Sequence, residues 1–204
     1  QRDYNALMHD VREVLPGQFP YDTLRTHIAL AVLIRNSPGA NGGGLADEPS
    51  KKFYAPYKNV MDMTSIGIQP FSLKLDSINP NGVMLWNPAD NKEALFELRR
   101  NINRRLMWEK EQDPDFYFEN KDGKPNTNTG TIHTSFLRFA DRGGLTAKFD
   151  DYKRVIGEAN DAVQMGELFA EPLVVDEIAL IESRVSRNIS ARDAFSFRMS
   201  NSTS

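Results

Sequence analysis

Cysteine is absent from this chain of 204 residues, and its absence excludes disulfide bonds, thiolate metal sites and cysteine nucleophiles. Histidine is scarce. The three histidines, His9, His27 and His133, have no second histidine four residues away, so the local sequence predicts no metal site. Long apolar runs are also lacking, because none approaches the ~20 residues that a membrane helix needs. We therefore expect a soluble protein without membrane insertion.

Neither positive nor negative charge is in large excess, since the chain has 25 Lys and Arg, 28 Asp and Glu, and a net charge of −3. No overall field therefore attracts nucleic acid or an anionic membrane. The glycine-rich phosphate loop, the dinucleotide-binding fingerprint and the Gly-x-Ser-x-Gly motif are missing. We predict no cofactor and assign no catalytic residue, although a site assembled from residues distant in sequence leaves no such motif.

The clearest pattern in the chain is a long helix expected over residues 90–112. Asp90 is the expected N-cap, and Glu93 follows three residues later as in a capping box. Pro114 ends the helix, because the residue before a proline avoids the helical conformation. Apolar residues recur at steps of three and four, which places one stripe against the core. They are Leu95, Leu98, Ile102 and Leu106.

The same helix holds four arginines: Arg99, Arg100, Arg104 and Arg105. Helical periodicity predicts that Arg100 and Arg104 point away from the leucines, whereas Arg99 and Arg105 flank them. Glu97 is placed to pair with Arg100. One interpretation is a face that binds phosphate or a partner's carboxylates, since each guanidinium offers a two-pronged donor. The other is a solvated face whose arginine stems cover apolar surface.

A second candidate surface interleaves lysines with aromatic residues over residues 51–58. Nucleic-acid bases stack on such rings while lysines contact phosphates. The alternative is a loop whose aromatic side chains cover the edge of the core. The candidate binding residues of this segment are Lys51, Lys52, Tyr54, Tyr57 and Lys58.

The N-terminal half is expected to contain a pair of antiparallel helices and a hairpin. Residues 3–15 and 21–35 have the apolar spacing of helices. Residues 37–50, rich in glycine, are expected to form a flexible loop. From residue 60 to residue 86 the apolar period changes to two, and Asn79–Gly82 predicts a turn between two strands.

The C-terminal half is expected to add short strands at 116–118 and 131–139, which are rich in aromatic and β-branched residues. Two helices should follow. One begins near Asp150, and the other begins at Pro172, since proline is favoured at the first helical position. Residues 195–199 alternate in polarity, which predicts a short strand or an exposed docking segment.

These elements together predict a single α+β domain over residues 1–204. It should contain a helical N-terminal pair, a small and mainly antiparallel sheet, a long central helix and C-terminal helices. Hairpin-length links dominate between the strands, which favours antiparallel pairing. The last residues, 200–204, are expected to form a loose tail.

Opposite charges are segregated along the middle of the chain. Residues 99–110 hold five basic side chains against one acid, and residues 109–122 hold six acids against two lysines. Such opposed patches suit contacts between identical subunits, and head-to-tail contacts of that kind build rings or filaments. The alternative is that the patches neutralise each other within one subunit.

These patterns favour a non-enzymatic structural or adaptor subunit of a larger assembly, such as a virion, a phage tail or a secretion apparatus. Its partners would be other copies of itself or other protein subunits. One alternative is a protein that contacts nucleic acid through the arginine-rich helix. Another is a hydrolase with a scattered site. The sequence leaves the compartment open, and the alternatives are a place in a particle and export after N-terminal processing. The first residue is Gln1 rather than Met, which fits either a trimmed chain or the removal of an upstream segment.

Overall fold

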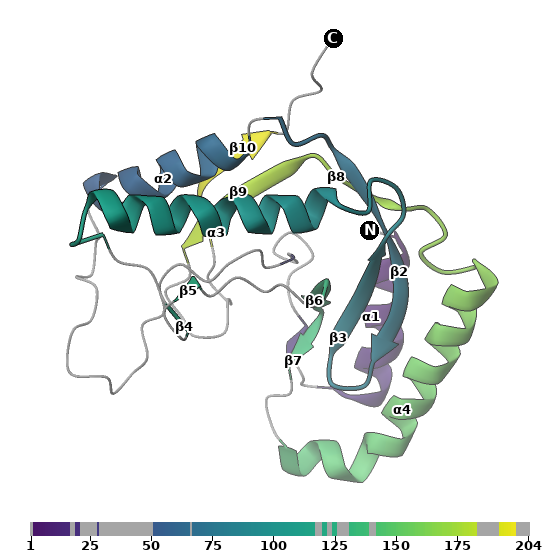
Figure 1. The fold of residues 1–204 in the computed structure, drawn as a ribbon. Coiled ribbons are helices and arrows are strands. Elements are labelled where there is room, and N and C mark those ends of the chain that lie inside the picture. Colours follow the sequence, from purple (N-terminus) through teal and green to yellow (C-terminus); the bar gives the residue numbers. More distant parts are fainter. Residues whose placement is uncertain are drawn as a thin grey trace.

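The computed structural model describes residues 2–16, 19–20, 28, 51–65, 67–116, 120–121, 124–125, 131–138, 142–182 and 192–198. These residues form helices and antiparallel strands, which confirms the predicted α+β class (Figure 1). The loop expected at 37–50 and the tail expected at 200–204 lie outside the described part of the chain.

Helix α1 (Arg2–Val14) confirms the first predicted helix. It packs against helix α4 (Arg142–Met165), and both lie on the side of the molecule that carries the β2–β3 hairpin (Figure 1). The second helix, expected at 21–35, falls outside the described residues except for Ile28, which is in no helix and is half-buried against the core. The buried residues of α1 and its C-terminal extension are Tyr4, Leu7, Met8, Val11 and Leu15.

A four-stranded antiparallel sheet has the strand order β6-β3-β2-β8. The predicted hairpin is confirmed, since β2 and β3 are neighbours joined by the expected turn. Alternate residues of β2 are buried, so one side of the hairpin faces the core. The four strands are β2 (Phe71–Asn79), β3 (Val83–Pro88), β6 (His133–Ser135) and β8 (Leu173–Val175).

The hairpin turn depends on Gly82. Its φ is +87°, in the region that favours glycine. Its carbonyl oxygen accepts the N–H groups of Phe136 at 2.9 Å and Leu137 at 3.3 Å. A Cβ on Gly82 would therefore lie 2.3 Å from the carbonyl oxygen of Leu137. The turn is thus held against β7 (Leu137–Arg138), which also pairs with β1 (Phe19–Pro20).

Helix α4 covers the part of the β2 edge that β8 does not reach. β8 pairs with Phe71–Leu73 only. Beyond a bulge at Asp76, the side-chain amide of Asn160 accepts the N–H of Ile78 at 2.7 Å and donates to its carbonyl oxygen at 2.9 Å. Gln164 donates to the carbonyl oxygen of Asp76 at 3.2 Å. Side-chain amides therefore bond to backbone groups that would otherwise be left open at a strand edge.

The start of α4 differs from the prediction, because the helix begins at Arg142 rather than near Asp150. Gly143 and Gly144 disfavour a helix by about 1 kcal/mol each. That preference is weak, and extending a long helix by about two further turns outweighs it. No helix within the described ranges combines the length and the apolar character that crossing a bilayer requires. The predicted apolar face of α4 is buried at Tyr152, Val155, Ile156 and Val163.

The helix predicted from Pro172 is wrong. The chain there forms β8 and then β9 (Glu177–Glu182), which pairs antiparallel with β10 (Arg192–Arg198). Valine and isoleucine recur here, and such β-branched residues lose side-chain freedom in a helix but pack well in a strand. β10 confirms the alternative of a short strand for the segment that begins at residue 195.

The strand predicted at 131–139 is divided at Phe136 into β6 and β7. Phe116, from the strand predicted at 116–118, is buried but lies in no strand, and the next two residues lie outside the described part. A short hairpin follows, made of β4 (Asn120–Lys121) and β5 (Lys124–Pro125).

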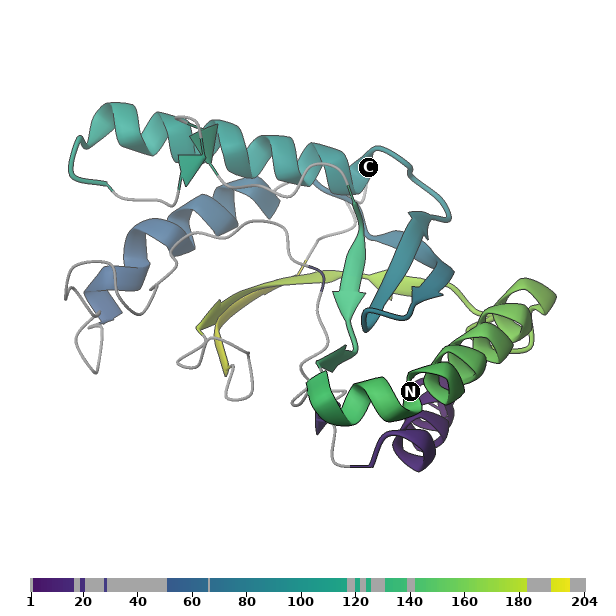
Figure 2. The same cartoon turned by 90° about the horizontal axis from the view of Figure 1, so that it is seen from below.

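Helices α2 (Lys51–Ser65) and α3 (Ala94–Gln112) pack side by side, and α2 also contacts β9 and β10. Figure 2 shows α3 along the outer margin of the molecule, with α2 next to it and β9 beyond α2. The loop predicted at 51–58 and the first residues of the strand-like period, 60–65, are therefore corrected to one helix.

Pro56 lies inside α2, and proline normally argues against a helix because it lacks an N–H donor. The residues after Pro56 nevertheless recur at helical steps and are buried, so packing of this face stabilises the helix. This spacing is the sequence signal that predicts α2. The buried residues are Tyr57, Val60, Met61 and Thr64.

Candidate interaction surface

The inner face of α3 includes Arg99 in addition to the predicted leucines. Its side chain is only 1% exposed, and its guanidinium donates to the carbonyl oxygen of Thr131 at 3.3 Å. Burial lowers the pKa of Arg99, because desolvation disfavours the charged form. Arg99 therefore belongs to the interior, beside the leucines that it was predicted to flank. The predicted apolar stripe is confirmed as buried at Leu95, Leu98, Ile102 and Leu106.

The N-terminus of α3 also differs from the prediction. The helix begins at Ala94, with Glu93 at the N-cap and no side-chain capping bond. The carboxylate of Asp90 instead accepts the N–H of Ser72 at 2.6 Å. This hydrogen bond lowers the pKa of Asp90, since it stabilises the charged form. Asp90 thus joins the segment before α3 to the start of β2.

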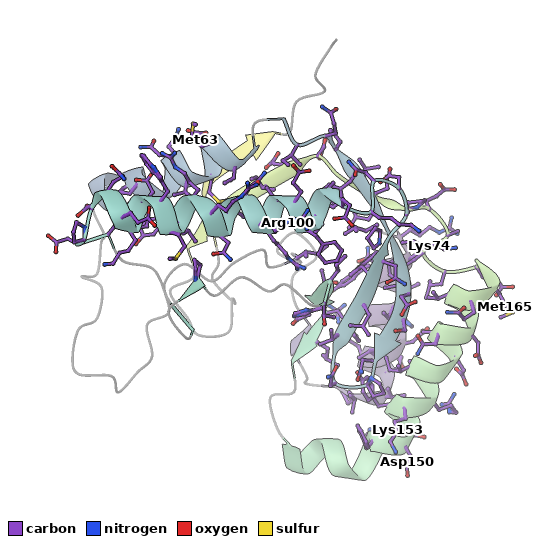
Figure 3. All side chains as sticks on the ribbon, viewed as in Figure 1. Met63, Lys74, Arg100, Asp150, Lys153 and Met165 are labelled. Carbon is purple, nitrogen blue, oxygen red and sulfur yellow. The ribbon has the colours of Figure 1, made fainter. Side chains whose placement is uncertain are left out.

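The outer face of α3 carries three exposed side chains at four-residue steps, which makes them neighbours on one side of a helix. Figure 3 labels the first of them, Arg100. Arg100 pairs with Glu93 at 3.3 Å, rather than with the predicted Glu97. Arg104 donates to the side-chain oxygen of Asn101. We define the outer stripe as Arg100, Arg104 and Trp108.

Trp108 is the large apolar member of the outer stripe and is 44% exposed. The guanidinium carbon of Arg105 lies 4.0 Å from the centre of its ring, as in a cation–π contact. A guanidinium nitrogen of Arg105 also lies 2.7 Å from Glu109, and both side chains of that pair are largely buried. Arg105 therefore holds the indole in place. The helical position of Trp108, on the side away from the leucines, is the sequence signal that identifies it.

An acidic segment follows the outer stripe at the C-terminal end of α3. All three of its carboxylates are exposed. The chain turns there, because the N–H of Asp115 bonds to the carboxylate of Asp113 at 2.9 Å and Lys110 donates to the carbonyl oxygen of Pro114. The two further acids of the predicted patch, at 119 and 122, have side chains outside the described part. We define the acidic turn as Glu111, Asp113 and Asp115.

The second candidate surface, at residues 51–58, is part of α2. Tyr57 is buried and its ring centre lies 5.3 Å from that of Phe116. Lys58 pairs with Asp62 at 2.6 Å, one turn later in the helix. Tyr57 therefore packs in the core instead of offering a face for a base to stack on. The side chains of the remaining candidates, Lys51, Lys52 and Tyr54, lie outside the described residues.

Histidines and carboxylates are the side chains of this chain that could form a metal-binding group. Within the described ranges no three such side chains lie close enough together to hold a metal ion. His133 is half-buried on β6. The hydroxyl of the next residue, Thr134, accepts the indole N–H of Trp86 at 2.7 Å inside the core. This hydroxyl therefore helps to hold the sheet together. The alternative function of a hydrolase with a scattered site stays a prediction.

Two comparisons with known proteins found no relative of this chain. No family model matches the chain, and no curated protein matches it either. Inferences about function therefore rest on the surface described above. Its distinctive features are an exposed tryptophan and two exposed arginines on α3, with the acidic turn at the C-terminal end of that helix.

Proposed function

We propose that this chain is a non-enzymatic structural or adaptor subunit of a larger protein assembly, which self-associates through opposed charge patches on α3. The observation that carries the proposal is the exposed Trp108 between two arginines and the acidic turn. A virion, a phage tail or a secretion apparatus is the kind of assembly that would use such a subunit.

Trp108 supports a protein contact because of the energetics of exposed aromatic surface. A partner that covers its ring removes a large apolar area from water. Tryptophan and arginine are the residues most enriched at interface hot spots. Trp108 also has a restrained ring, since Arg105 packs on it. Less side-chain freedom is therefore lost when the partner binds.

The charges of the outer stripe support a protein partner as well. The Arg100–Glu93 pair is exposed on both sides, and exposed pairs of this kind contribute little to the stability of a folded chain. Replacing such a contact by one to a partner therefore costs little. Complementary charges then orient the partner and accelerate its association.

The test is light scattering coupled to size-exclusion chromatography over a range of protein and salt concentrations. We expect oligomers at high protein concentration that dissociate as salt rises, because salt screens exposed charges. Trp108→Ala should raise the dissociation constant roughly 30-fold, the effect of a hot spot worth about 2 kcal/mol. A chain that stays monomeric under all conditions contradicts the proposal.

The matched control is Met165→Ala. Met165 is also a large exposed apolar side chain, 65% exposed, but it lies at the end of α4 (Figure 3). Its replacement should leave the dissociation constant unchanged. Equal effects of Trp108→Ala and Met165→Ala would mean that general surface hydrophobicity, rather than α3, drives association.

A second candidate function is contact with nucleic acid through the outer stripe. It is favoured by two exposed arginines one turn apart with an aromatic ring one turn further on, a combination that suits phosphate contact and base stacking. The pairing of Arg100 with Glu93 opposes it. Filter binding against salt tests this function. Binding that weakens steeply with salt, and that is lost in R100A/R104A, supports nucleic acid over a protein partner.

A further inference from the structure

The outer face of α3, together with its N-cap and the acidic turn that follows it, has its charges in an order that is complementary to itself. From the N-terminal end, two acids are followed by two arginines, then by Trp108, then by two acids. All seven side chains are exposed. Reversing the direction of a second copy about Trp108 brings its C-terminal acids to the arginines of the first. The series is Glu93, Glu97, Arg100, Arg104, Trp108, Glu111 and Asp115.

We propose that two copies of this chain pair through their α3 helices in antiparallel orientation, about a two-fold axis at Trp108. The proposal rests on the self-association proposed above and specifies its geometry. Arg104 of each copy faces Glu111 of the other, and Arg100 faces Asp115. The two indole rings meet at the axis, where each covers apolar surface of the other.

The spacing along the helix agrees with this arrangement. Arg104 lies four residues before Trp108 and Glu111 lies three after it, which corresponds to about 6 Å and about 4.5 Å along the axis. Packed helices are about 8–10 Å apart. Arginine and glutamate side chains on facing helices can span that distance. The Arg104–Glu111 pair can therefore form twice, once at each end of the contact.

Access to α3 also agrees with this arrangement. α3 lies along the outer margin of the molecule and α2 packs on its other side (Figure 2). The buried side of α3, with Leu98 and Ile102, faces inward. A second copy can therefore approach the outer stripe without displacing the core.

A two-fold contact satisfies the charges more completely than the head-to-tail contact predicted from sequence. In an isologous contact each pair occurs twice, so both the arginines and the acids of each copy are used and the assembly closes as a dimer. In a head-to-tail contact, a basic patch and an acidic turn stay open at the ends of every chain of copies. The dimer would be the unit from which a larger assembly is built.

A second antiparallel register has to be distinguished. It would set Arg100 against Glu97 and Arg104 against Glu93, about an axis near Leu98 in the N-terminal third of α3. That register leaves Trp108 outside the contact. It also uses both members of the Arg100–Glu93 pair of each chain, whereas the register about Trp108 uses only Arg100. We therefore place the axis at Trp108.

The decisive experiment uses two charge-reversal variants and their mixture, measured by light scattering at low salt. R100E/R104E makes the outer stripe acidic, and E111R/D115R makes the acidic turn basic. Each variant alone should dimerise at least about tenfold more weakly than the natural chain, because like charges face each other. An equimolar mixture should restore a dimer that contains one copy of each. Restoration also shows that both variants are folded.

Two control variants define specificity. K153E/R154E changes the net charge by the same amount as R100E/R104E but lies on α4, and it should leave dimerisation unchanged. E93R/E97R reverses the acids of the competing register and should also leave it unchanged. Loss of dimerisation in E93R/E97R, with none in E111R/D115R, would overturn the register proposed here.

Tryptophan fluorescence gives an independent measurement. The chain has two tryptophans, and Trp86 is buried in the core while Trp108 is exposed. Emission should therefore shift to shorter wavelength as dilute protein is concentrated, because Trp108 leaves water. Association without such a shift would place Trp108 outside the contact and overturn the inference.

The outcomes separate this inference from the proposed function. Association that ignores R100E/R104E and E111R/D115R, or that grows beyond a dimer by repeated addition of single copies, contradicts the two-fold contact while leaving self-association intact. A chain that is monomeric at every concentration and salt contradicts both.

Discussion

The side of the molecule built on the β2–β3 hairpin and the side built on α3 use polar residues in opposite ways. On the hairpin side, polar side chains bond inward to backbone groups, as Asn160 does to Ile78. On the α3 side, the polar groups of the outer stripe face solvent in blocks of like charge. The first arrangement completes the fold, and the second leaves a surface that a partner can complete.

The outer surfaces of the two long helices sharpen this contrast. On α4, opposite charges are interleaved, so that Lys153 pairs with Asp150 at 3.0 Å and Arg154 with Glu158 at 2.8 Å. Figure 3 shows Lys153 and Asp150 together near the lower end of α4. On the outer stripe of α3, Arg100 and Arg104 lie one turn apart, and the carboxylates of the acidic turn follow at the C-terminal end. Interleaved charges neutralise each other within one helix, whereas segregated charges favour an external partner.

The largest expected effect on the hairpin side comes from Gly82→Ala. Alanine at a positive φ costs about 1 to 2 kcal/mol, and the new Cβ overlaps the carbonyl oxygen of Leu137. We expect the free energy of unfolding to fall by about 3 kcal/mol or more, as measured by urea denaturation. The matched control is Gly157→Ala in α4, where a Cβ meets nothing within 4 Å. It should raise stability by up to about 1 kcal/mol.

Asn160→Ala should have the next largest effect. The change removes both hydrogen bonds to Ile78 and leaves backbone groups at a half-buried strand edge without that partner. We expect a loss of about 2 kcal/mol in the free energy of unfolding. Gln164→Ala removes one exposed bond and should cost less than about 1 kcal/mol. Similar losses in the two variants would show that the edge of β2 does not depend on Asn160.

Neither Gly82→Ala nor Asn160→Ala should change the dissociation constant of the folded protein, when measured well below its unfolding midpoint. The reason is that both residues lie away from the outer stripe. Conversely, Trp108→Ala should weaken association and leave the free energy of unfolding of the monomer almost unchanged. A stability variant of the hairpin that abolishes association would break the distinction between the two sides.

The smallest effect is expected from Asp90→Asn and appears only in acid. The hydrogen bond from Ser72 lowers the pKa of Asp90 below its ordinary value of 3.8. Because the folded-state pKa is lower than the unfolded-state pKa, the charged group stabilises the fold above pH 3.8, and this contribution is lost as the pH falls below that value. The natural chain should therefore lose more stability than Asp90→Asn between pH 5 and pH 2. Parallel stability curves in urea denaturation would contradict this role.

Sequence reasoning located the elements whose apolar residues have one consistent period. α1 and the inner face of α3 were predicted because their buried residues recur at helical steps, and the β2–β3 hairpin was predicted from alternation and the turn that ends at Gly82. The prediction from sequence was wrong where the local conformational preference of a residue opposed the tertiary packing. Pro56 obscured α2, and the residues after Pro172 were assigned to a helix although they form β8 and β9.

The candidate site was predicted only in part. Periodicity placed Arg100 and Arg104 on the outer face, and both are exposed. It could not show that Arg99 is buried and bonds to Thr131, because that partner is distant in sequence. Trp108 was not among the predicted residues, although its helical position on the side away from the leucines places it on the outer face.

The α+β class, the buried leucine stripe of α3 and the order of charges along its outer face follow from the amino-acid sequence, since each depends on spacing within single segments. The burial of Arg99, the hydrogen bond of Asp90 and the place of α3 at the outer margin of the molecule depend on the folded chain. Those features depend on contacts between segments far apart in the chain. The spacing of residues within one segment carries no record of such contacts.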